Sequence, residues 1–378
     1  MKSFFKVLPF LGVLLLSLNA CNDKVDVIGD FQETAVVYGL LDQSDSIHFI
    51  KITRAFVGPG NALEISKIPD SNYFQNISVS ITEELPGGAI GRTWTLFDTL
   101  VDTKETNGVF YAPEQKVYAF YTHEKDNSDS PTFAPLNTLA KYNLHIMIDE
   151  GQESQFEVYG STQIVSGITT STDAPHYQFK FAEDANVTGE YRASVMFVNT
   201  GNAALINSTL FIDVKSFHGN DSLVKRIKWK LGENATDNGT TAVFSVNGES
   251  FFELIDQALE DESINVTRRV IEGITVEVVG GSEDLYTYIL VNKPNNSLTQ
   301  NKPTFTNLSA TNEHPAIGLF SSRYTRRVYH PMVGNNQSTR CIDYLSSMEL
   351  CIGPITGSYS FCSQQPLDIA QGQPWACN

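Results

Sequence analysis

Short stretches of alternating apolar and polar residues recur along most of this chain. In the clearest of them, residues 77–82 (ISVSIT), one face is aliphatic and the other carries hydroxyl groups. Successive side chains of a strand point to opposite sides of a sheet, so this period of two predicts strands with one buried face. Segments rich in Gly, Pro, Asn and Asp separate the stretches, as expected of turns. The chain is therefore predicted to be mainly β.

The first part of the chain, residues 34–166, predicts an immunoglobulin-like antiparallel sandwich. Roughly seven or more short strands fit into this span, which is the density expected of such a domain. A Ser/Thr-rich stretch at 167–172 is interpreted as a linker. The predicted strands are two within 36–56, on either side of a turn at 42–45, and others at 77–82, 92–100, 108–111, 116–121, 141–148 and 154–162.

Residues 174–330 predict a second, β-rich domain with one or two helices. The segment 250–261 repeats apolar residues at helical spacing, with Ser250 as N-cap and a Glu three positions later as a capping box. A second helix is expected over 284–291, opened by Ser282. The predicted strands are at 178–182, 191–199, 208–217, 224–230, 242–246 and 268–279.

Four cysteines lie close to the end of the chain and predict disulfides. They are separated by nine, ten and fourteen residues, spacings that match no zinc motif. In an oxidising compartment such cysteines pair, and the three ways of pairing all remain open. We expect them to staple a Gly- and Pro-rich tail, residues 331–378, that has little core of its own. The candidates are Cys341, Cys351, Cys362 and Cys377.

The first 20 residues have the parts of a secretory signal: Lys2 and Lys6, then an apolar run at 7–18, then small residues. That run is too short to span a bilayer, which takes about 20 apolar residues. Residues 18–21 (LNAC) resemble the lipobox of bacterial lipoproteins. This resemblance implies removal of residues 1–20, acylation of Cys21 and a lipidated tether at 21–33; the alternative is an ordinary secretion signal with a structural Cys21.

The charge of the chain limits its partners. Without the lysines of the signal, 24 basic and 43 acidic residues give a formal net charge of −19. A nucleic-acid phosphate backbone requires clustered Lys and Arg, so nucleic acid is not an expected partner. Anionic lipid surfaces are disfavoured for the same reason, and attachment to an outer-membrane lipid is expected to depend on the acyl chains.

Several segments together resemble a family of Bacteroidota outer-membrane lipoproteins known only as a domain of unknown function. Genes of this family commonly sit beside TonB-dependent receptors, which implies an outer-membrane β-barrel partner. The family has no agreed catalytic residues, so none is transferred to this chain. The matching segments are 37–42 (VYGLLD), 50–58 (IKITRAFVG), 60–62 (GNA) and 69–74 (PDSNYF). Weaker matches are 142–144, 317–322 and the Cys-rich ending.

In these bacteria an acidic signal after the lipidated Cys directs lipoproteins to the cell surface. Here Asp23 and Asp26 flank Lys24, a diluted form of that signal. We expect a lipid anchor in the outer membrane, with the cell surface favoured over the periplasmic face.

The sequence contains no motif of a common catalytic site. It lacks G-x-S-x-G, H-E-x-x-H, a P-loop and a strand-linked G-x-G-x-x-G, and no two histidines lie four residues apart. His48 lies on the polar phase of a predicted strand, so a solvated imidazole is expected. No catalytic residue, metal or cofactor is predicted. The histidines are His48, His123, His145, His176, His218, His314 and His330.

Charged clusters have ordinary explanations. Adjacent carboxylates at 83–84, 149–150 and 260–262 are interpreted as solvated acids at turns or helix ends. Arg323, Arg326 and Arg327 are expected to pair with carboxylates of this chain, although an acidic partner surface is the alternative. A calcium loop would need oxygen ligands at regular spacing, which is not found around Asp42, Asp45, Asp126 and Asp129.

Trp229 alternates with Ile227 and Leu231, which indicates a core position. Asp-Ser/Thr-aliphatic triplets resemble the O-glycosylation sequon of these bacteria, and their candidate hydroxyls are Ser46, Thr99 and Ser222.

These observations favour a non-catalytic accessory lipoprotein that works with an outer-membrane partner. A surface hydrolase or glycan-binding enzyme, with a site assembled from distant residues, is the first alternative. An adhesin or a structural subunit of a secretion or assembly complex is the second.

Overall fold

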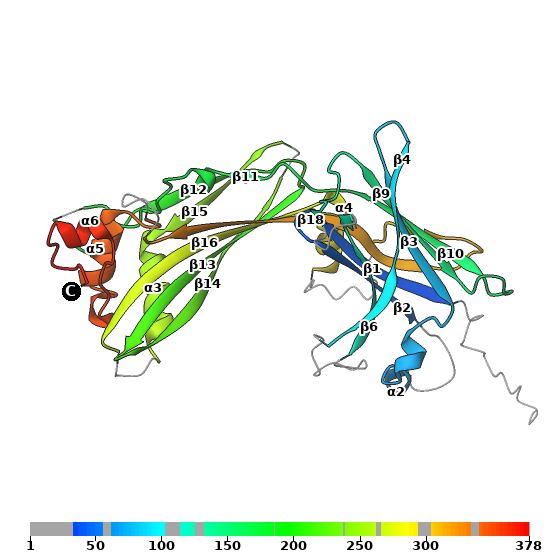
Figure 1. The fold of residues 1–378 in the computed structure, drawn as a ribbon, viewed down its shortest axis with the longest axis horizontal. Helices are drawn as coiled ribbons and strands as arrows, with labels where there is room; N and C mark the ends of the chain where they lie inside the picture. Colours follow the sequence, from blue (N-terminus) through cyan, green and yellow to red (C-terminus); the bar gives the residue numbers. More distant parts are fainter. Residues whose placement is uncertain are drawn as a thin grey trace, which may run out of the picture.

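The computed structural model of the chain describes residues 33–55, 62–102, 114–124, 132–184, 186–236, 239–261, 266–293, 304–333 and 340–377. The protein is mainly β, as predicted, and its strands form two bodies at either end of an elongated molecule (Figure 1). The predicted strand at 108–111 lies outside the described residues.

The N-terminal body is an antiparallel sandwich of two sheets. One sheet contains β1 (Thr34–Asp42), β2 (Ile47–Ala55), β6 (Gln115–Tyr121) and β5 (Phe97–Val101) in that order; the other contains β10 (Phe156–Gln163), β9 (Lys141–Ile148), β3 (Ile77–Glu84) and β4 (Ile90–Thr95). When these strands are lettered in chain order, the first sheet reads A-B-E-D and the second reads G-F-C, as in the immunoglobulin constant-type fold. Strand β4 is an additional strand beside C. The immunoglobulin-like prediction is confirmed.

Alternation along these strands builds the core between the two sheets. Val37, Ile50, Ile81, Leu144 and Val158 all point inward and are buried. The predicted single strand at 92–100 is in fact two, because the chain passes from one sheet to the other at Leu96, between β4 and β5. Smaller elements at the edges are α2 (Ala62–Ile65), η2 (Pro69–Asn72), and the short pair β7 (His123–Glu124) and β8 (Thr132–Phe133).

A single strand, β18 (Ala316–Pro331), belongs to both bodies. Its first half runs parallel to β1, and its second half runs antiparallel to β16 (Arg268–Gly281). One eight-stranded sheet therefore extends through the molecule in the order β14-β13-β16-β18-β1-β2-β6-β5 (Figure 1). Residues of β18 and of β17 (Leu308–Ala310), which pairs with β10, complete the N-terminal sandwich, although we expected residues 174–330 to form a separate domain.

The second body places β13 (Leu205–His218), β14 (Asp221–Ala235), β16 and the end of β18 against a three-stranded sheet of β11 (Thr169–Thr170), β12 (Ala193–Asn199) and β15 (Thr241–Asn247). Part of the expected linker forms β11 and the short helix η3 (Ser171–Asp173). Helix α3 (Gly248–Leu259) contributes Phe251, Phe252, Ile255 and Leu259 to the core.

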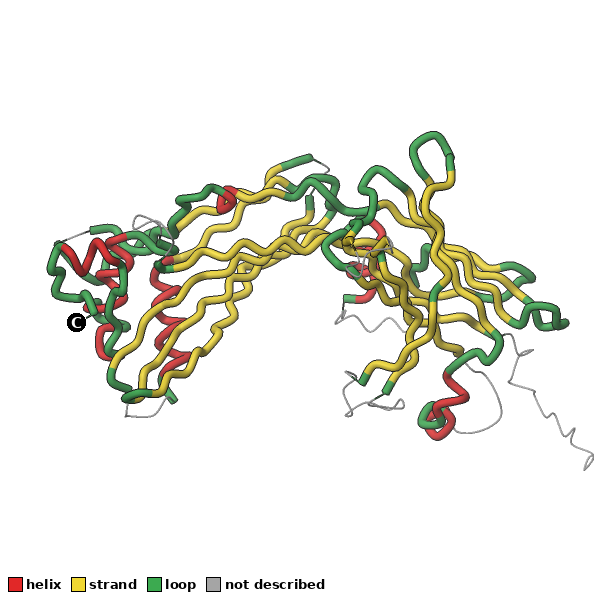
Figure 2. Tube along the Cα trace, in the orientation of Figure 1, coloured by secondary structure: helices red, strands yellow, loops and turns green. Residues whose placement is uncertain are grey.

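The two predicted helices are present, with one correction. Helix α3 is capped by Asn247, whose side chain accepts from the backbone N–H of Ser250, and not by Ser250 itself. The strand β15 ends at Asn247, so the helix begins immediately and Ser250 lies inside its first turn. Helix α4 (Glu283–Asn292) begins at Ser282 as predicted, and it lies beside β18 at the junction of the two bodies (Figure 2).

The C-terminal tail is part of the second core, which corrects our expectation of a tail with little core. It contains α5 (Tyr344–Ile352), η4 (Gly357–Tyr359) and α6 (Pro366–Ala370), and isolated parallel bridges join Ile342 to Phe179 and Phe361 to Arg269. Apolar side chains of the tail, including Met348, Leu350 and Trp375, are buried against the sheet.

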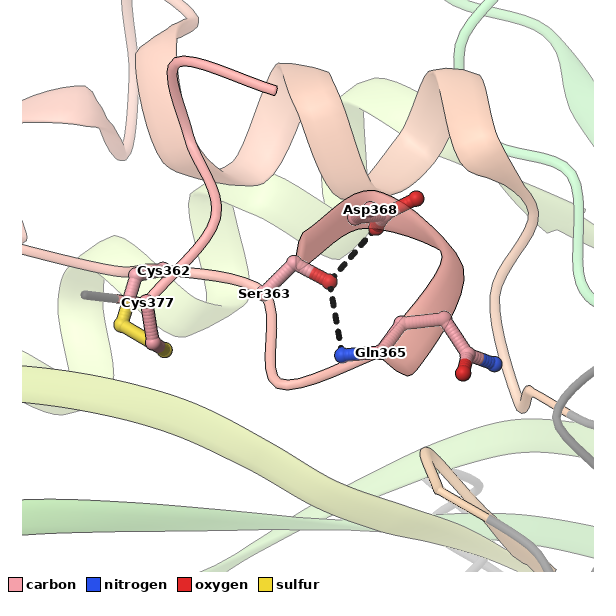
Figure 3. Close-up of a disulfide and its surroundings, with 5 residues drawn as sticks. All are labelled: Cys362, Ser363, Gln365, Asp368 and Cys377. Atoms are coloured by element: carbon pink, nitrogen blue, oxygen red, sulfur yellow. Dashed lines mark hydrogen bonds between the residues drawn. A yellow bond between two sulfur atoms is a disulfide. The ribbon is translucent and has the colours of Figure 1, made fainter. Parts of the chain in front are cut away.

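Of the four cysteines predicted to pair, only Cys362 and Cys377 form a disulfide (Figure 3). Beside it, Asp368 accepts hydrogen bonds from Ser363 and from Arg340, which ties the last turn of the chain together. Cys341 and Cys351 are free and buried, because they occupy core positions among apolar side chains; the Sγ of Cys341 lies 3.8 Å from the Sδ of Met332.

The two free thiols are therefore expected to resist alkylation in the folded protein. Burial raises the pKa of both Cys341 and Cys351 to about 12, so the reactive thiolate is scarce at neutral pH. Iodoacetamide should label neither thiol under native conditions and both in denaturant without reductant, as read by intact mass. Rapid labelling of the native protein would contradict the buried positions.

Candidate ligand groove

An open groove of about 390 Å³ lies on the outer face of the long sheet, where β1, β2 and β18 meet α4. Its apolar walls come from Tyr38 and Leu40 of β1, Phe49 of β2, and Leu285 and Tyr288 of α4. Asp45 and Arg323 form its polar end. We call this set of residues the junction groove.

Both faces of β1 and β2 are apolar, and this explains why the groove forms here. Val37 and Leu41 fill the core, so the intervening Tyr38 points outward and remains 39% exposed. In β2, Ile50 faces the core and Phe49 faces out. Helix α4 packs beside β18, and its Leu285 and Tyr288 close one side of this outer face.

Two tyrosines meet across the groove. The rings of Tyr38 and Tyr288 lie 6.0 Å apart at a steep angle, and the hydroxyl of Tyr288 donates to that of Tyr38 at 3.2 Å. Burial and this hydrogen bond raise the pKa of Tyr38 to about 12. The Tyr38 hydroxyl is therefore neutral at neutral pH, and the pair can offer aromatic faces and hydroxyl groups to a ligand.

The charged end of the groove is internally paired. The buried Asp42 accepts hydrogen bonds from Ser44 and from the backbone N–H of Thr325, and the Nε of Arg323 lies 3.6 Å from its Oδ2. Burial, followed by the nearby charge of Asp42, raises the pKa of Asp45.

The considered calcium loop gains no support from this geometry. Both oxygens of Asp42 already accept from donors of the protein, and within the described ranges no group of three or more His, Cys, Asp or Glu side chains is arranged to hold a metal. Asp126 and Asp129 lie outside the described residues.

The prediction of a solvated His48 is wrong. The side chain is 2% exposed and stacks on Phe120 with ring centroids 4.9 Å apart. Segment 46–52 has apolar residues on both faces of the strand, so its pattern does not show which face is buried. His48 lies on the same face as Ile50 and Ile52, and this is the face that points into the core. Burial lowers the pKa of His48 to about 4, so its imidazole is neutral at neutral pH.

The remaining histidines do not converge on the groove. His145 contacts Glu157 at 2.8 Å, His314 stacks on Phe156, and His330 is buried near Phe179. His176 is exposed and His218 is half-buried. None of these lines the junction groove, and the side chain of His123 is not among those described.

The carboxylate interpretation is right at two places and wrong at one. Asp149 and Glu150 occupy a turn, and Glu260 and Asp261 are exposed at the end of α3, while Glu262 lies outside the described residues. Glu83, expected to be solvated, is only 4% exposed. It binds the guanidinium of Arg92 at 2.8 Å and the hydroxyl of Tyr142 at 2.7 Å, inside the N-terminal sandwich.

The three arginines near the end of β18 pair with carboxylates of this chain, as predicted. Arg326 lies 3.0 Å from Asp173, and Arg327 lies 2.7 Å from Glu277. With the Arg323–Asp42 contact, each of the three has an acidic neighbour, so this cluster is explained by internal pairing.

The other predicted residues lie apart from the groove or near its rim. Trp229 packs half-buried on the second core, as predicted. Ser46 is half-buried just before β2, and Thr99 is half-buried on β5. Ser222 is exposed at the start of β14. Cys21 lies outside the described residues. No helix among those described is long and apolar enough to cross a membrane.

The aromatic groove was not predicted from the sequence. Its signal was present in 37–40 and 47–50, where neighbouring residues on both strand phases are apolar, a pattern that leaves one apolar set outside the sandwich. No pattern in the neighbouring sequence predicts that Tyr288 and Leu285 line the groove, because this depends on where α4 packs.

No family model matches the chain, and no curated protein matches it. Among solved structures, the C-terminal globular domain of an oligosaccharyltransferase from Pyrococcus abyssi aligns at 10% identity with a TM-score of 0.23, covering 64% of this chain and 42% of that one. The chain therefore spans less than half of that structure, and a likeness of this degree carries no argument about function.

Proposed function

We propose that this chain is a non-catalytic, lipid-anchored outer-membrane protein that acts as a binding subunit of an outer-membrane β-barrel, such as a TonB-dependent receptor. The observation that carries the proposal is Cys21, placed directly after a signal-like segment in a lipobox-like sequence. Two or more acyl chains on one residue give stable attachment, which an acidic protein needs because anionic lipid does not attract it. The cell-surface leaflet is the favoured location.

The junction groove supports a binding role. Its walls are aromatic and aliphatic, its tyrosine pair is hydrogen-bonded, and its arginine lies beside a buried aspartate. Such a concave surface, with few polar groups at defined places, is typical of ligand recognition. The exposed rings of Tyr38 and Phe49 favour a ligand with an apolar face, and glycan binding is therefore the second candidate function.

Membrane fractionation and affinity purification of the wild type and a Cys21→Ser variant test this proposal. The wild type should fractionate with the outer membrane and co-purify with a β-barrel protein. The Ser variant keeps the size of the side chain but cannot form the thioether, so it should be lost from the outer-membrane fraction. A variant that stays in the outer membrane would refute the lipid anchor, and a wild type that recovers no β-barrel would refute the partner.

A further inference from the structure

Strand β14 is an unusually long free edge of the eight-stranded sheet. It is the terminal strand in the sheet order, and within the part of the chain that the structure describes its fifteen residues pair with β13 alone. The ten residues Asp221–Lys230 pair without interruption, before a bulge near Leu231. At the opposite edge of the same sheet, β5 has five residues. Natural sheets usually shorten, bulge or cover their edges, because unpaired backbone groups attract another strand.

The outward face of this edge carries a row of cations in an acidic protein. Arg226, Lys228 and Lys230 alternate along β14, so their side chains recur about 6.7 Å apart. Arg226 is held by Asp213 through two hydrogen bonds, whereas Lys228 lies over the ring of Phe211. Among the described residues, no carboxylate oxygen lies within 4 Å of Lys228 or Lys230.

The inward face of the same edge is apolar and incompletely covered. Ile227 is buried and Trp229 is half-buried against the second core. Helix α3 runs beside them: the ring of Trp229 is 6.5 Å from that of Phe251, and Lys225 donates to the carbonyl of Ala258. Leu254 and Ala258, one turn apart on α3, are likewise only partly buried.

We propose that β14 is a docking edge for an extended segment of a partner protein in which acidic and apolar residues alternate. Such a segment would add a strand antiparallel or parallel to β14 through backbone hydrogen bonds, which is the mode of recognition known as β-augmentation. Its acidic side chains would stand beside Lys228 and Lys230, and its apolar side chains would cover Trp229, Leu254 and Ala258. Opposite charges on neighbouring strands stabilise pairing, and like charges destabilise it.

A second copy of this chain does not fit the edge through its own β14. Pairing two β14 strands would bring their rows of Arg and Lys together, and the like charges would repel. Charge complementarity therefore selects a different strand, rich in Asp or Glu on one face. This inference does not depend on the lipid anchor or on the identity of the membrane partner.

A fluorescein-labelled peptide about ten residues long, with alternating Glu and Val or Ile, tests the proposal by fluorescence anisotropy with the mature chain. A control peptide of the same composition has its acids in one block and its apolar residues in another. The alternating peptide should bind and the block peptide should not. In hydrogen exchange, binding should protect the backbone amides of β14 and leave those of β5 unchanged.

Charge reversal provides the matched variants. Lys228→Glu with Lys230→Glu should weaken binding of the alternating peptide by about tenfold or more, because two attractive cross-strand pairs become repulsive. A peptide carrying Lys in place of Glu should bind this double variant and not the wild type. Lys141→Glu, an exposed lysine on β9 of the other body, should leave binding unchanged.

Three results would overturn the proposal. Equal binding of the alternating and block peptides would show attraction to negative charge without strand pairing. Binding without new protection in β14 would place the peptide elsewhere. Failure of the Lys-bearing peptide to bind the double variant, with that variant melting like the wild type, would show that the charges of β14 do not select the partner.

Discussion

Replacing Glu83 with Gln is expected to lower the free energy of unfolding by about 2 kcal/mol at neutral pH, because the half-buried guanidinium of Arg92 loses its charged partner and the hydrogen bonds to it weaken. Glu83 accepts from the Nη2 and Nε of Arg92, from the backbone N–H of Arg92 and from Tyr142. The hydroxyl of Tyr142 also accepts from the backbone N–H of Asn137, the tyrosine corner of immunoglobulin-like domains. The variant therefore disturbs the point where β3, β4 and β9 are tied together.

The same contacts give this loss a defined pH dependence. Burial alone would raise the pKa of Glu83, but the hydrogen bonds from Arg92 and Tyr142 outweigh it and lower the pKa to about 2, from an ordinary value of 4.5. A depressed folded-state pKa stabilises the protein above the unfolded value, and this contribution disappears as pH falls from about 4.5 through about 2. Urea unfolding of wild type and variant should therefore converge over that range.

Glu84→Gln is the matched control for this prediction. Glu84 is the next residue of β3, is half-buried and accepts one hydrogen bond from Asn143. Its replacement should cost about 1 kcal/mol or less, the ordinary value of one hydrogen bond. If both variants lost the same stability, or if the Glu83 variant kept a constant deficit down to pH 2, the buried ion pair would not be the cause.

Truncation of Phe320 to Ala is expected to destabilise the N-terminal sandwich by about 3–5 kcal/mol, the usual range for removing a buried aromatic ring from a core. Phe320 is fully buried, and it comes from β18, about 150 residues or more after every other buried residue of that core except Leu308. Its ring lies close to Gly39 of β1 and Gly160 of β10, so it fills the space between the two sheets. Few other positions test so directly whether β18 completes this sandwich.

Hydrogen exchange resolved by mass spectrometry can follow the effect in both bodies. Because β18 is paired with β1 and with β16, weakening its first half should increase exchange in β1 and, to a lesser extent, in β16. Ile317→Ala is the control: it lies three residues earlier on the same strand, 42% exposed on the outer face, and should change stability by about 0.5 kcal/mol. A Phe320 variant as stable as this control would remove β18 from the N-terminal core.

Local patterns in the sequence predict much of the fold. Alternation of apolar and polar residues predicts most strands. The turn residues between them predict short, closely spaced strands, as in an immunoglobulin-like sandwich. Ser282 was identified correctly as the start of α4, because an N-cap acts within its own turn. Trp229 packs on the second core, and the three arginines of β18 pair with carboxylates, as the sequence predicted.

What the sequence did not predict depends on contacts between distant residues. The pairing of β1 with β18 joins residues about 280 positions apart, such as Tyr38 and Leu319, and no periodicity encodes it. Glu83 resembled a turn acid because Arg92 and Tyr142, which compensate its burial, are not adjacent to it. His48 could face either side of a strand that is apolar on both phases, and packing against Phe120 decided the outcome.

The arrangement of β1 also determines how the protein would respond to mechanical force at its N-terminal end. β1 lies between β2 and β18; it pairs with β18 from Ala35 to Asp42 and with β2 from Thr34 to Gly39, through hydrogen bonds that cross between the strands. Tension along the axis of β1 would load these bonds together, in shear, instead of peeling them apart one at a time. Because β18 continues into the second body, part of that load would pass to β16. A chain held by its N-terminus would thus distribute strain across the whole sheet.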